Sequence, residues 1–233
     1  KIILRISAIV LFLATIDTGS RAAFGLIIII TLVDFIYLII KHRKLSTFFL
    51  LFGLVSCAGV LFSYNPPQAL ERILVRDHIL HDDARDKIRN FSYYAFKKNP
   101  LLGIGFGNHG QIKIEDIKDE IIKDKGVFNA KEYKSGSHAH NVYYTYLVSG
   151  GLLIFSIFLW FWFYIVWIIF KLRSTKENDW IVLSSISVLL INLGIGWVNT
   201  TLHHEHAILS MFVLGMLISE YRRAEHGRSL HVP

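Results

Sequence analysis

Residues 142–170 read VYYTYLVSGGLLIFSIFLWFWFYIVWIIF and contain no charged side chain. A membrane-spanning helix needs about 20 mainly apolar residues, so this stretch is long for a single span. Five further apolar stretches cover residues 2–16, 22–40, 47–64, 180–198 and 207–219, of which the first and the last are short. We therefore predict an all-α, polytopic membrane protein with about six transmembrane helices.

The composition agrees with a membrane protein. Hydrophobic residues make up 53% of the 233 residues, charged residues only 18%, and the mean hydropathy is +0.44. Soluble proteins carry about 25% charged residues, so a water-soluble globule and a disordered chain are both disfavoured. The single cysteine, Cys57, excludes an intramolecular disulfide framework. Because the sequence starts with Lys1, we expect a C-terminal portion of a longer polytopic protein.

Basic residues near the spans predict the orientation of the chain. Short basic clusters precede the first span, separate the second from the third and the fourth from the fifth, and follow the sixth. Cytoplasmic loops are enriched in lysine and arginine, so all four clusters are expected on the cytoplasmic side. This distribution, rather than binding to nucleic acid, explains the net charge of +7. The predicted organisation is transmembrane helices 1–3 in residues 1–64, a periplasmic loop in 65–138, transmembrane helices 4–6 in 139–220, and a cytoplasmic tail in 221–233.

The loop is long for a connection, and loops of that length are often functional. Residues 82–98 predict an amphipathic helix with Ile88, Phe91, Tyr94 and Ala95 on one side. The following Asn99-Pro100 should end that helix, since proline disfavours the helical conformation of the residue before it. Residues 112–125 predict a second, charged helical stretch. We expect a small helical cap on the outer membrane surface.

Three arginines are candidates for binding an anion. Arg21 lies at the start of the second span, and Arg85 and Arg89 are four residues apart on one helix face. A guanidinium group is always charged and matches the oxygens of a phosphate. The alternatives are that Arg21 only reaches the membrane interface, and that Arg85 and Arg89 belong to a solvated charged helix.

A glycine-rich stretch follows the predicted loop helix. Residues 99–109 read NPLLGIGFGNH, in which Gly103, Gly105 and Gly107 permit tight turns and the close approach of a ligand. No Lys-Ser or Lys-Thr pair follows these glycines, so a phosphate-binding P-loop is disfavoured. The alternative is a plain turn next to the membrane.

Histidines gather at the start of the fourth span, which reads Ser137-His138-Ala139-His140-Asn141. Imidazole changes charge near neutral pH and suits a general base. Metal binding is a rival interpretation, because His203, His204 and His206 are predicted on the same side of the membrane. Trp197 is a candidate for stacking on a sugar.

Taken in order, these motifs resemble the bacterial O-antigen ligase and O-antigen polymerase superfamily. The resemblance rests on Ser20-Arg21-Ala22-Ala23, on Arg85 placed fifteen residues before Pro100, on Pro100-Leu-Leu-Gly103-Ile-Gly105-Phe-Gly107, and on His138-Ala-His140-Asn141-Val-Tyr143. It covers residues 17 to about 155. The family often has glycine where Ala22 stands and tryptophan where Arg89 stands, so this chain departs from the family at two positions.

The resemblance implies a multi-pass glycosyltransferase of the bacterial inner membrane, with its active site facing the periplasm. The donor would be a glycan on undecaprenyl pyrophosphate, and a ligase would transfer it to a hydroxyl of lipid A–core oligosaccharide. His140 would act as the base, and Arg21 and Arg85 would hold the pyrophosphate. His138, Arg89, Asn141, Gly103 and Gly105 would bind substrate. No cofactor or metal is implied, and configuration at the anomeric carbon would invert.

Other functions fit parts of the sequence. A polymerase of O-antigen or exopolysaccharide, or a protein O-oligosaccharyltransferase, would use the same catalytic residues on another acceptor. A transporter of anionic lipid-linked glycan would also need outward-facing cations, although its ionisable groups should lie nearer the bilayer midplane. A metal-dependent membrane hydrolase built on the histidines would be sensitive to a chelator.

Overall fold

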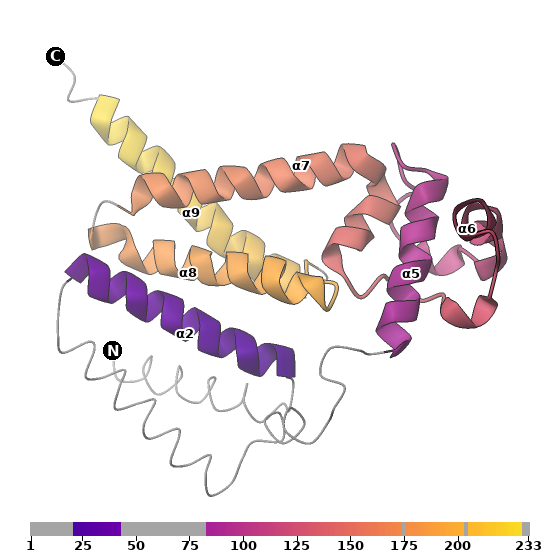
Figure 1. Ribbon diagram of the computed structural model, residues 1–233. Helices are drawn as coiled ribbons and strands as arrows, with labels where there is room; N and C mark the ends of the chain where they lie inside the picture. The colour runs from indigo at the N-terminus through magenta and orange to yellow at the C-terminus, as the bar shows by residue number, and fades with distance from the viewer. Residues whose placement is uncertain (1–20, 43–82, 174–175, 203–204, 230–233) are drawn as a thin grey trace, which may run out of the picture. The chain divides into compact units, whose positions relative to one another are not determined.

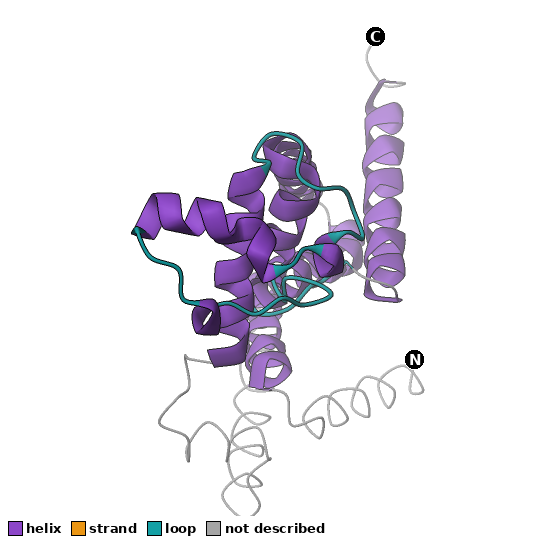
Figure 2. Cartoon of the chain, turned by 90° about the vertical axis from the view of Figure 1, so that its right-hand side faces the viewer, coloured by secondary structure: helices purple, strands orange, loops and turns teal. Residues whose placement is uncertain are grey.

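The computed structural model describes residues 21–42, 83–173, 176–202 and 205–229. In these ranges all regular secondary structure is helical, and Figure 2 shows helices joined by loops with no strand. The predicted all-α class is confirmed for them. The chain divides into two compact units, residues 1–80 and 81–233, which are described separately.

The described part of the first unit is one helix, α2 (Arg21–His42). It contains the second predicted span, residues 22–40, which is rich in isoleucine, leucine and phenylalanine and has Thr31, Asp34 and Tyr37 spaced three residues apart. The hydroxyl of Thr31 donates to the carbonyl of Ile27, one turn earlier, at 2.7 Å. The first and third predicted spans, residues 2–16 and 47–64, lie outside the described residues.

Three long helical segments of the second unit pack against one another: α7 (Val142–Leu172), the helix that begins with α8 (Asp179–Leu189), and α9 (Glu205–Ser229). Beyond α8 the chain continues as a π-helical turn, η5 (Leu190–Gly194), and a 3-10 turn, η6 (Ile195–Trp197). Residues 142–172 and 179–197 are long and apolar enough to cross a membrane. The sixth predicted span, residues 207–219, lies within α9. The total of six spans stays a prediction.

Helix α7 is broken at Gly151, whose φ of 62° and ψ of −164° are not helical. A single continuous helix was expected from residues 142–170, and the structure instead has a short segment, residues 142–150, and a long segment, residues 152–172. The left-handed φ explains why glycine occupies the break, since a Cβ atom is disfavoured there. The break also explains the excess length of the apolar stretch, because the long segment alone rises about 30 Å.

A loop from elsewhere in the chain repairs this break. In an intact helix the amides of Leu152 and Leu153 would donate to the carbonyls of Val148 and Ser149. Here they donate to Pro100 and Leu101 at 2.8 and 3.3 Å. The two orphaned carbonyls accept instead from Ile104 and Gly105, at 2.9 and 2.8 Å. Residues 100–105 therefore replace two lost helical hydrogen bonds with four bonds between loop and helix.

The cap consists of α5 (Asp83–Lys98) and a series of short helices: η1 (His109–Gln111), η2 (Ile114–Ile117), α6 (Lys118–Lys125) and η3 (Ala130–Glu132). The predicted helix 82–98 is confirmed over residues 83–98, as is its end at Asn99-Pro100, and helix forms in the second predicted stretch from Ile114 onward. Buried Phe91, Tyr94 and Ile121 form the centre of the cap core. Val148 of α7 joins this core, so the cap is packed on the short segment of α7.

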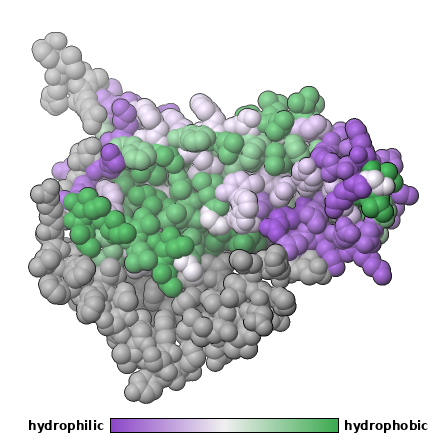
Figure 3. Space-filling view, viewed as in Figure 1, coloured by the Kyte–Doolittle hydropathy of each residue, from purple (hydrophilic) through white to green (hydrophobic). Residues whose placement is uncertain are grey.

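The surface reflects this division. Figure 3 shows hydrophobic residues over the long helices and mainly hydrophilic residues over the cap. Helices α5 and α6 bury apolar residues on one side and expose lysine, aspartate and glutamate on the other, which is typical of a water-facing domain. The placement of residues 65–138 in the periplasm stays a prediction.

Candidate functional site

The site is organised around Asn141, the residue that caps α7. Its side-chain oxygen accepts from the amide of Tyr144 at 3.0 Å, which satisfies one of the free amides of the first helical turn. Its amide nitrogen donates to the carbonyl of Trp197 at 2.8 Å. The side chain is buried. Asn141 thus ties the beginning of α7 to the end of η6.

His138 and His140 lie directly before this cap. Their ring centroids are 4.2 Å apart, so the two imidazoles are in contact. His140 has a φ of 49°, a left-handed conformation that is uncommon outside glycine, although histidine adopts it more often than most residues do. Unusual backbone conformations of this kind concentrate at functional sites. Ser137 Oγ lies 2.9 Å from His138 Nδ1 and helps to orient that ring.

Arg85 reaches the same place from the cap. Its Nη1 donates to the carbonyl of Val198 at 3.3 Å, one residue beyond the carbonyl that Asn141 binds. The first turn of α5, the start of α7 and the end of η6 therefore meet at two neighbouring carbonyls. The structure brings together Arg85, His138, His140 and Asn141, four of the residues that the sequence pointed to.

Arg89 lies one helical turn beyond Arg85 and pairs with Asp86. Both side chains are partly exposed, so this ion pair contributes little to stability. Arg21 is the first residue of α2 in the other unit, and its side chain lies outside the described residues. The roles predicted for these two arginines stay predictions.

The end of the helix containing α8 is shaped to receive the start of α7. The hydroxyl of Tyr143 donates to the carbonyl of Leu193, within the π-helical turn, at 2.8 Å. A Cβ atom on Gly196 would lie 2.5 Å from Cγ1 of Val142, so only glycine fits there. π-Helical turns often occur at functional sites because they displace a helix end from its regular path. The indole of Trp197 is mostly exposed beside the ring of Tyr143.

His109 is a residue that the sequence analysis missed. It is buried, with Nδ1 2.8 Å from the carbonyl of Gly136 and Nε2 3.0 Å from the hydroxyl of Ser92. Burial lowers the pKa of His109; the hydrogen bond to Gly136 opposes this shift and the charge on His140 adds to it. His109 therefore connects Ser92 of α5 to Gly136, in the loop that leads to His140. The signal in the sequence was its position as the last residue of the glycine-rich stretch, to which no role was assigned.

Gly103 and Gly105 lie away from the histidines, at the far end of the short segment of α7. The segment rises about 12 Å between Asn141 and Ser149. A Cβ atom on Gly103 would lie 2.5 Å from the carbonyl carbon of Ser149, and one on Gly151 would lie 2.3 Å from Leu101. The structure thus gives Gly103 a packing role. Contact of Gly103 or Gly105 with a glycan stays a prediction.

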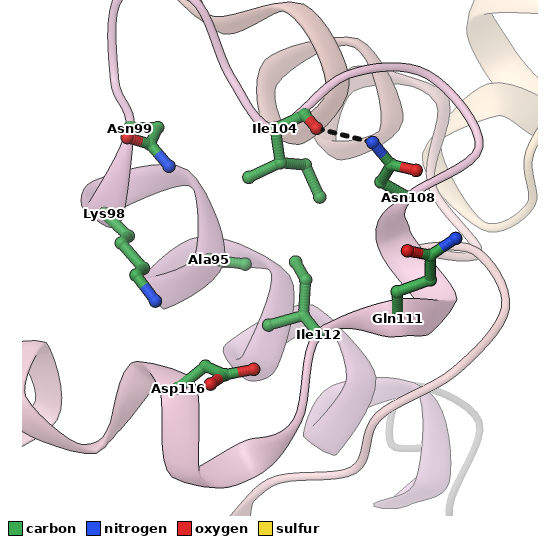
Figure 4. Close-up of a pocket in the computed structure, with 8 residues that line it drawn as sticks. All are labelled: Ala95, Lys98, Asn99, Ile104, Asn108, Gln111, Ile112 and Asp116. Atoms are coloured by element: carbon green, nitrogen blue, oxygen red, sulfur yellow. Dashed lines mark hydrogen bonds between the residues drawn. The ribbon is translucent and has the colours of Figure 1, made fainter.

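A shallow pocket of about 210 Å³ opens at the opposite end of α5 from Arg85. Figure 4 shows Ile104 and Ile112 at its centre, with polar side chains around them. The lining residues are Ala95, Lys98, Asn99, Ile104, Asn108, Gln111, Ile112 and Asp116. Since Lys98 is thirteen residues beyond Arg85, about 20 Å along the helix, this pocket is separate from the histidine site.

The side chains that the structure describes do not form a metal site. In the described ranges no three histidine, cysteine, aspartate or glutamate residues lie close enough together to hold a metal ion. His203 and His204 lie outside the described residues, as does the side chain of His206. The set of imidazoles proposed for a metal site therefore stays untested.

Comparison with known proteins identifies the family. The sequence matches the family model described as O-antigen ligase over residues 6–159, which is more than half of the chain and includes Arg21, Arg85 and His140. No curated protein and no solved structure matches the chain. Members of the family are membrane-embedded, glycosyltransferase-like enzymes, either ligases or polymerases. The match confirms the resemblance found in the ordered motifs, and the chain belongs to the O-antigen ligase family.

Proposed function

We propose that this protein is an O-antigen ligase that transfers a glycan from undecaprenyl pyrophosphate to a hydroxyl of lipid A–core oligosaccharide. The observation that carries the proposal is that Arg85 and Asn141 bind the neighbouring carbonyls of Val198 and Trp197, with His140 directly before Asn141 in the chain. In the proposal His140 supplies the base and Arg85 the cation that glycosyl transfer from a pyrophosphate needs.

In this mechanism His140 acts in its neutral form. It takes the proton of the acceptor hydroxyl while the oxygen attacks the anomeric carbon. The bond from that carbon to the pyrophosphate oxygen breaks on the opposite side, so the configuration inverts. The electron pair leaves with the pyrophosphate, and the guanidinium groups of Arg85 and Arg21 stabilise the growing negative charge. The arginines supply the charge that a metal ion would otherwise provide.

The residues around His140 support this role. Contact with His138 and the capping of α7 by Asn141 hold the imidazole at a fixed place before the helix. A rigid base is effective because the reacting atoms need to be held in a narrow range of positions. In the proposal His138 orients the acceptor, Asn141 positions His140, and Arg89 adds positive charge beside Arg85.

The depth of the site also supports a lipid-linked donor. The long segment of α7 and the helix from Asp179 to Trp197 each rise about 30 Å, the thickness of the hydrocarbon core. Asn141, the residue after His140, binds the carbonyl of Trp197 at the end of the second of these helices. The pyrophosphate of a membrane-anchored polyprenol lies at this same level, next to the hydrocarbon.

The test is lipopolysaccharide analysis in a strain lacking its own copy of the gene. We expect the full-length wild type to restore long glycan on the lipid A–core, and His140→Ala and Arg85→Ala to leave it on the lipid carrier. Matched controls are His226→Ala and Arg223→Ala on α9, which should behave as wild type. Activity should survive a chelator. Single-repeat caps on the core in the variants would indicate a polymerase, and an unchanged pattern would overturn the ligase assignment.

A further inference from the structure

The loop that repairs α7 carries an apolar surface unlike the rest of the cap. Leu101, Leu102 and Phe106 are 69%, 72% and 60% exposed, although the cap around them exposes mainly charged residues. Exposed apolar residues that occur together mark an interaction site rather than chance exposure. The three are confined to residues 100–106, which we term the repair loop.

This apolar surface continues onto α7. The backbone of Leu152 and Leu153 is hydrogen-bonded to Pro100 and Leu101, and the side chains of both leucines are exposed. Figure 3 shows hydrophobic surface extending along α7 to its end beside α5. The exposed leucines of the repair loop therefore adjoin the side of α7 that would face lipid.

The position of the loop along α7 matches the edge of a bilayer. The other end of the long segment carries Lys171 and is followed by Arg173, so that end lies at a membrane–water interface. The long segment, residues 152–172, rises about 30 Å, the thickness of the hydrocarbon core. Gly151 and the repair loop therefore fall at the opposite boundary of the hydrocarbon.

The backbone of the loop is also suited to that place. Irregular backbone is tolerated next to hydrocarbon only where its polar groups are hydrogen-bonded within the protein. The break in α7 frees two carbonyls and two amides, and the repair loop binds all four. In addition, the amide of Gly103 donates to the carbonyl of Asn99 at 2.9 Å. In a solvent-exposed turn, water would bind these carbonyls and amides, and hydrogen bonds within the protein would not be needed for them.

We propose that the repair loop is immersed in the bilayer, where Leu101, Leu102 and Phe106 contact lipid acyl chains and anchor the cap to the membrane. The proposal depends on α7 spanning a membrane and not on the transfer reaction. An anchor of this kind fixes the height of the cap, and with it Arg85, relative to the lipid surface. The short segment of α7 connects the anchor to His140 at its other end.

The experiment uses nitroxide spin labels on the full chain in liposomes of phosphatidylethanolamine and phosphatidylglycerol. In a Cys57→Ser background, single labels are placed by Leu102→Cys and, separately, by Phe106→Cys. Leu153→Cys on α7 is the lipid-facing reference. Val127→Cys is the matched control, because Val127 is an apolar cap residue of similar exposure, 68%, in the connection after α6. Collision with oxygen reports lipid, and collision with a water-soluble nickel chelate reports water.

We expect the labels at positions 102 and 106 to follow the reference at 153, with a ratio of oxygen to nickel collision several-fold higher than at 127. A ratio at 102 and 106 equal to that at 127 would overturn the proposal. Protection from both reagents would also overturn it, since that result means a protein partner covers the loop. Lipopolysaccharide analysis of the same variants is separate, so loss of ligase function would leave the collision result standing.

Discussion

The short segment of α7 is held in two different ways at its two ends. At the start, side chains make the contacts, since Asn141 binds Trp197 and Arg85 binds Val198. At Gly151 the contacts are between backbones, and side chains are excluded by Gly103 and Gly151. The first end carries the side chains proposed to act on a substrate, whereas the second is held by backbone packing alone. Changes at the first should alter chemistry, and changes at the second should alter folding.

The largest effect is expected from His140→Ala. A general base contributes about 10²–10⁴-fold to a rate, so transfer should fall by that amount. Alanine adopts the left-handed φ of this position less readily than histidine, and the cost of about 1 kcal/mol should leave the protein folded. Transfer of radiolabelled glycan in membranes gives the rate, and the amount of protein extracted in folded form gives the control. If the variant lost folded protein as well as activity, the start of the short segment of α7 would matter for folding too, and the contrast with the Gly151 end would fail.

Gly103→Ala should act in the opposite way, on folding. Its Cβ would lie 2.5 Å from backbone of α7, and its φ is 67°. Overpacking and the left-handed φ together cost about 3 kcal/mol. Gly107→Ala is the matched control, since Gly107 also has a positive φ, 81°, but no atom within 4 Å of its Cβ. Thermal unfolding in detergent should show a clear loss for Gly103→Ala and a small one for Gly107→Ala, and equal losses would contradict the packing role.

Substitutions of Asn141 should affect both stability and glycan transfer, because this residue caps α7 and lies next to His140. Asn141→Asp keeps an oxygen for the amide of Tyr144 but loses the donor to Trp197, whereas Asn141→Ala loses both. Loss of an N-cap costs about 1 kcal/mol, so only the alanine variant should lose that part of its stability. Both should lower transfer, because the link that holds His140 near η6 is gone. Full activity in Asn141→Asp would remove Trp197 from the positioning of the base.

Apolar patterns and local signals predicted the helices well. The helix 82–98 followed from its apolar side and ended at Asn99-Pro100, as expected from proline. The break at Gly151 was missed because Ser149-Gly150-Gly151 lies in an apolar run, and transmembrane helices often tolerate glycine. Its repair depends on residues about fifty positions earlier. Nothing local predicts a hydrogen bond over that distance.

The site shows the same limit. His138, His140 and Asn141 were indicated by their spacing, and Arg85 by its place before Pro100. The carbonyls of Trp197 and Val198 that bring them together carry no signal, because every residue has a carbonyl. The glycines were expected to approach a ligand, which stays a prediction, and the structure shows Gly103 packed on the backbone of α7. A glycine in the sequence indicates that another group packs closely against the backbone, but not whether that group is a ligand or a part of the protein.

The smallest effect concerns His109 and pH. Its pKa in the folded chain is below the ordinary value of about 6.5, so the unfolded chain binds a proton more readily. Its contribution to stability is therefore present above pH 6.5 and is lost as the pH falls through the lowered pKa. Hydrogen exchange of the amides in residues 88–92 and 136–141, corrected for intrinsic rates, should show weaker protection in acid. His109→Gln keeps a hydrogen-bonding side chain that does not titrate, so this loss should largely disappear. An equal loss in His109→Gln would show that His109 is not the source of the acid sensitivity.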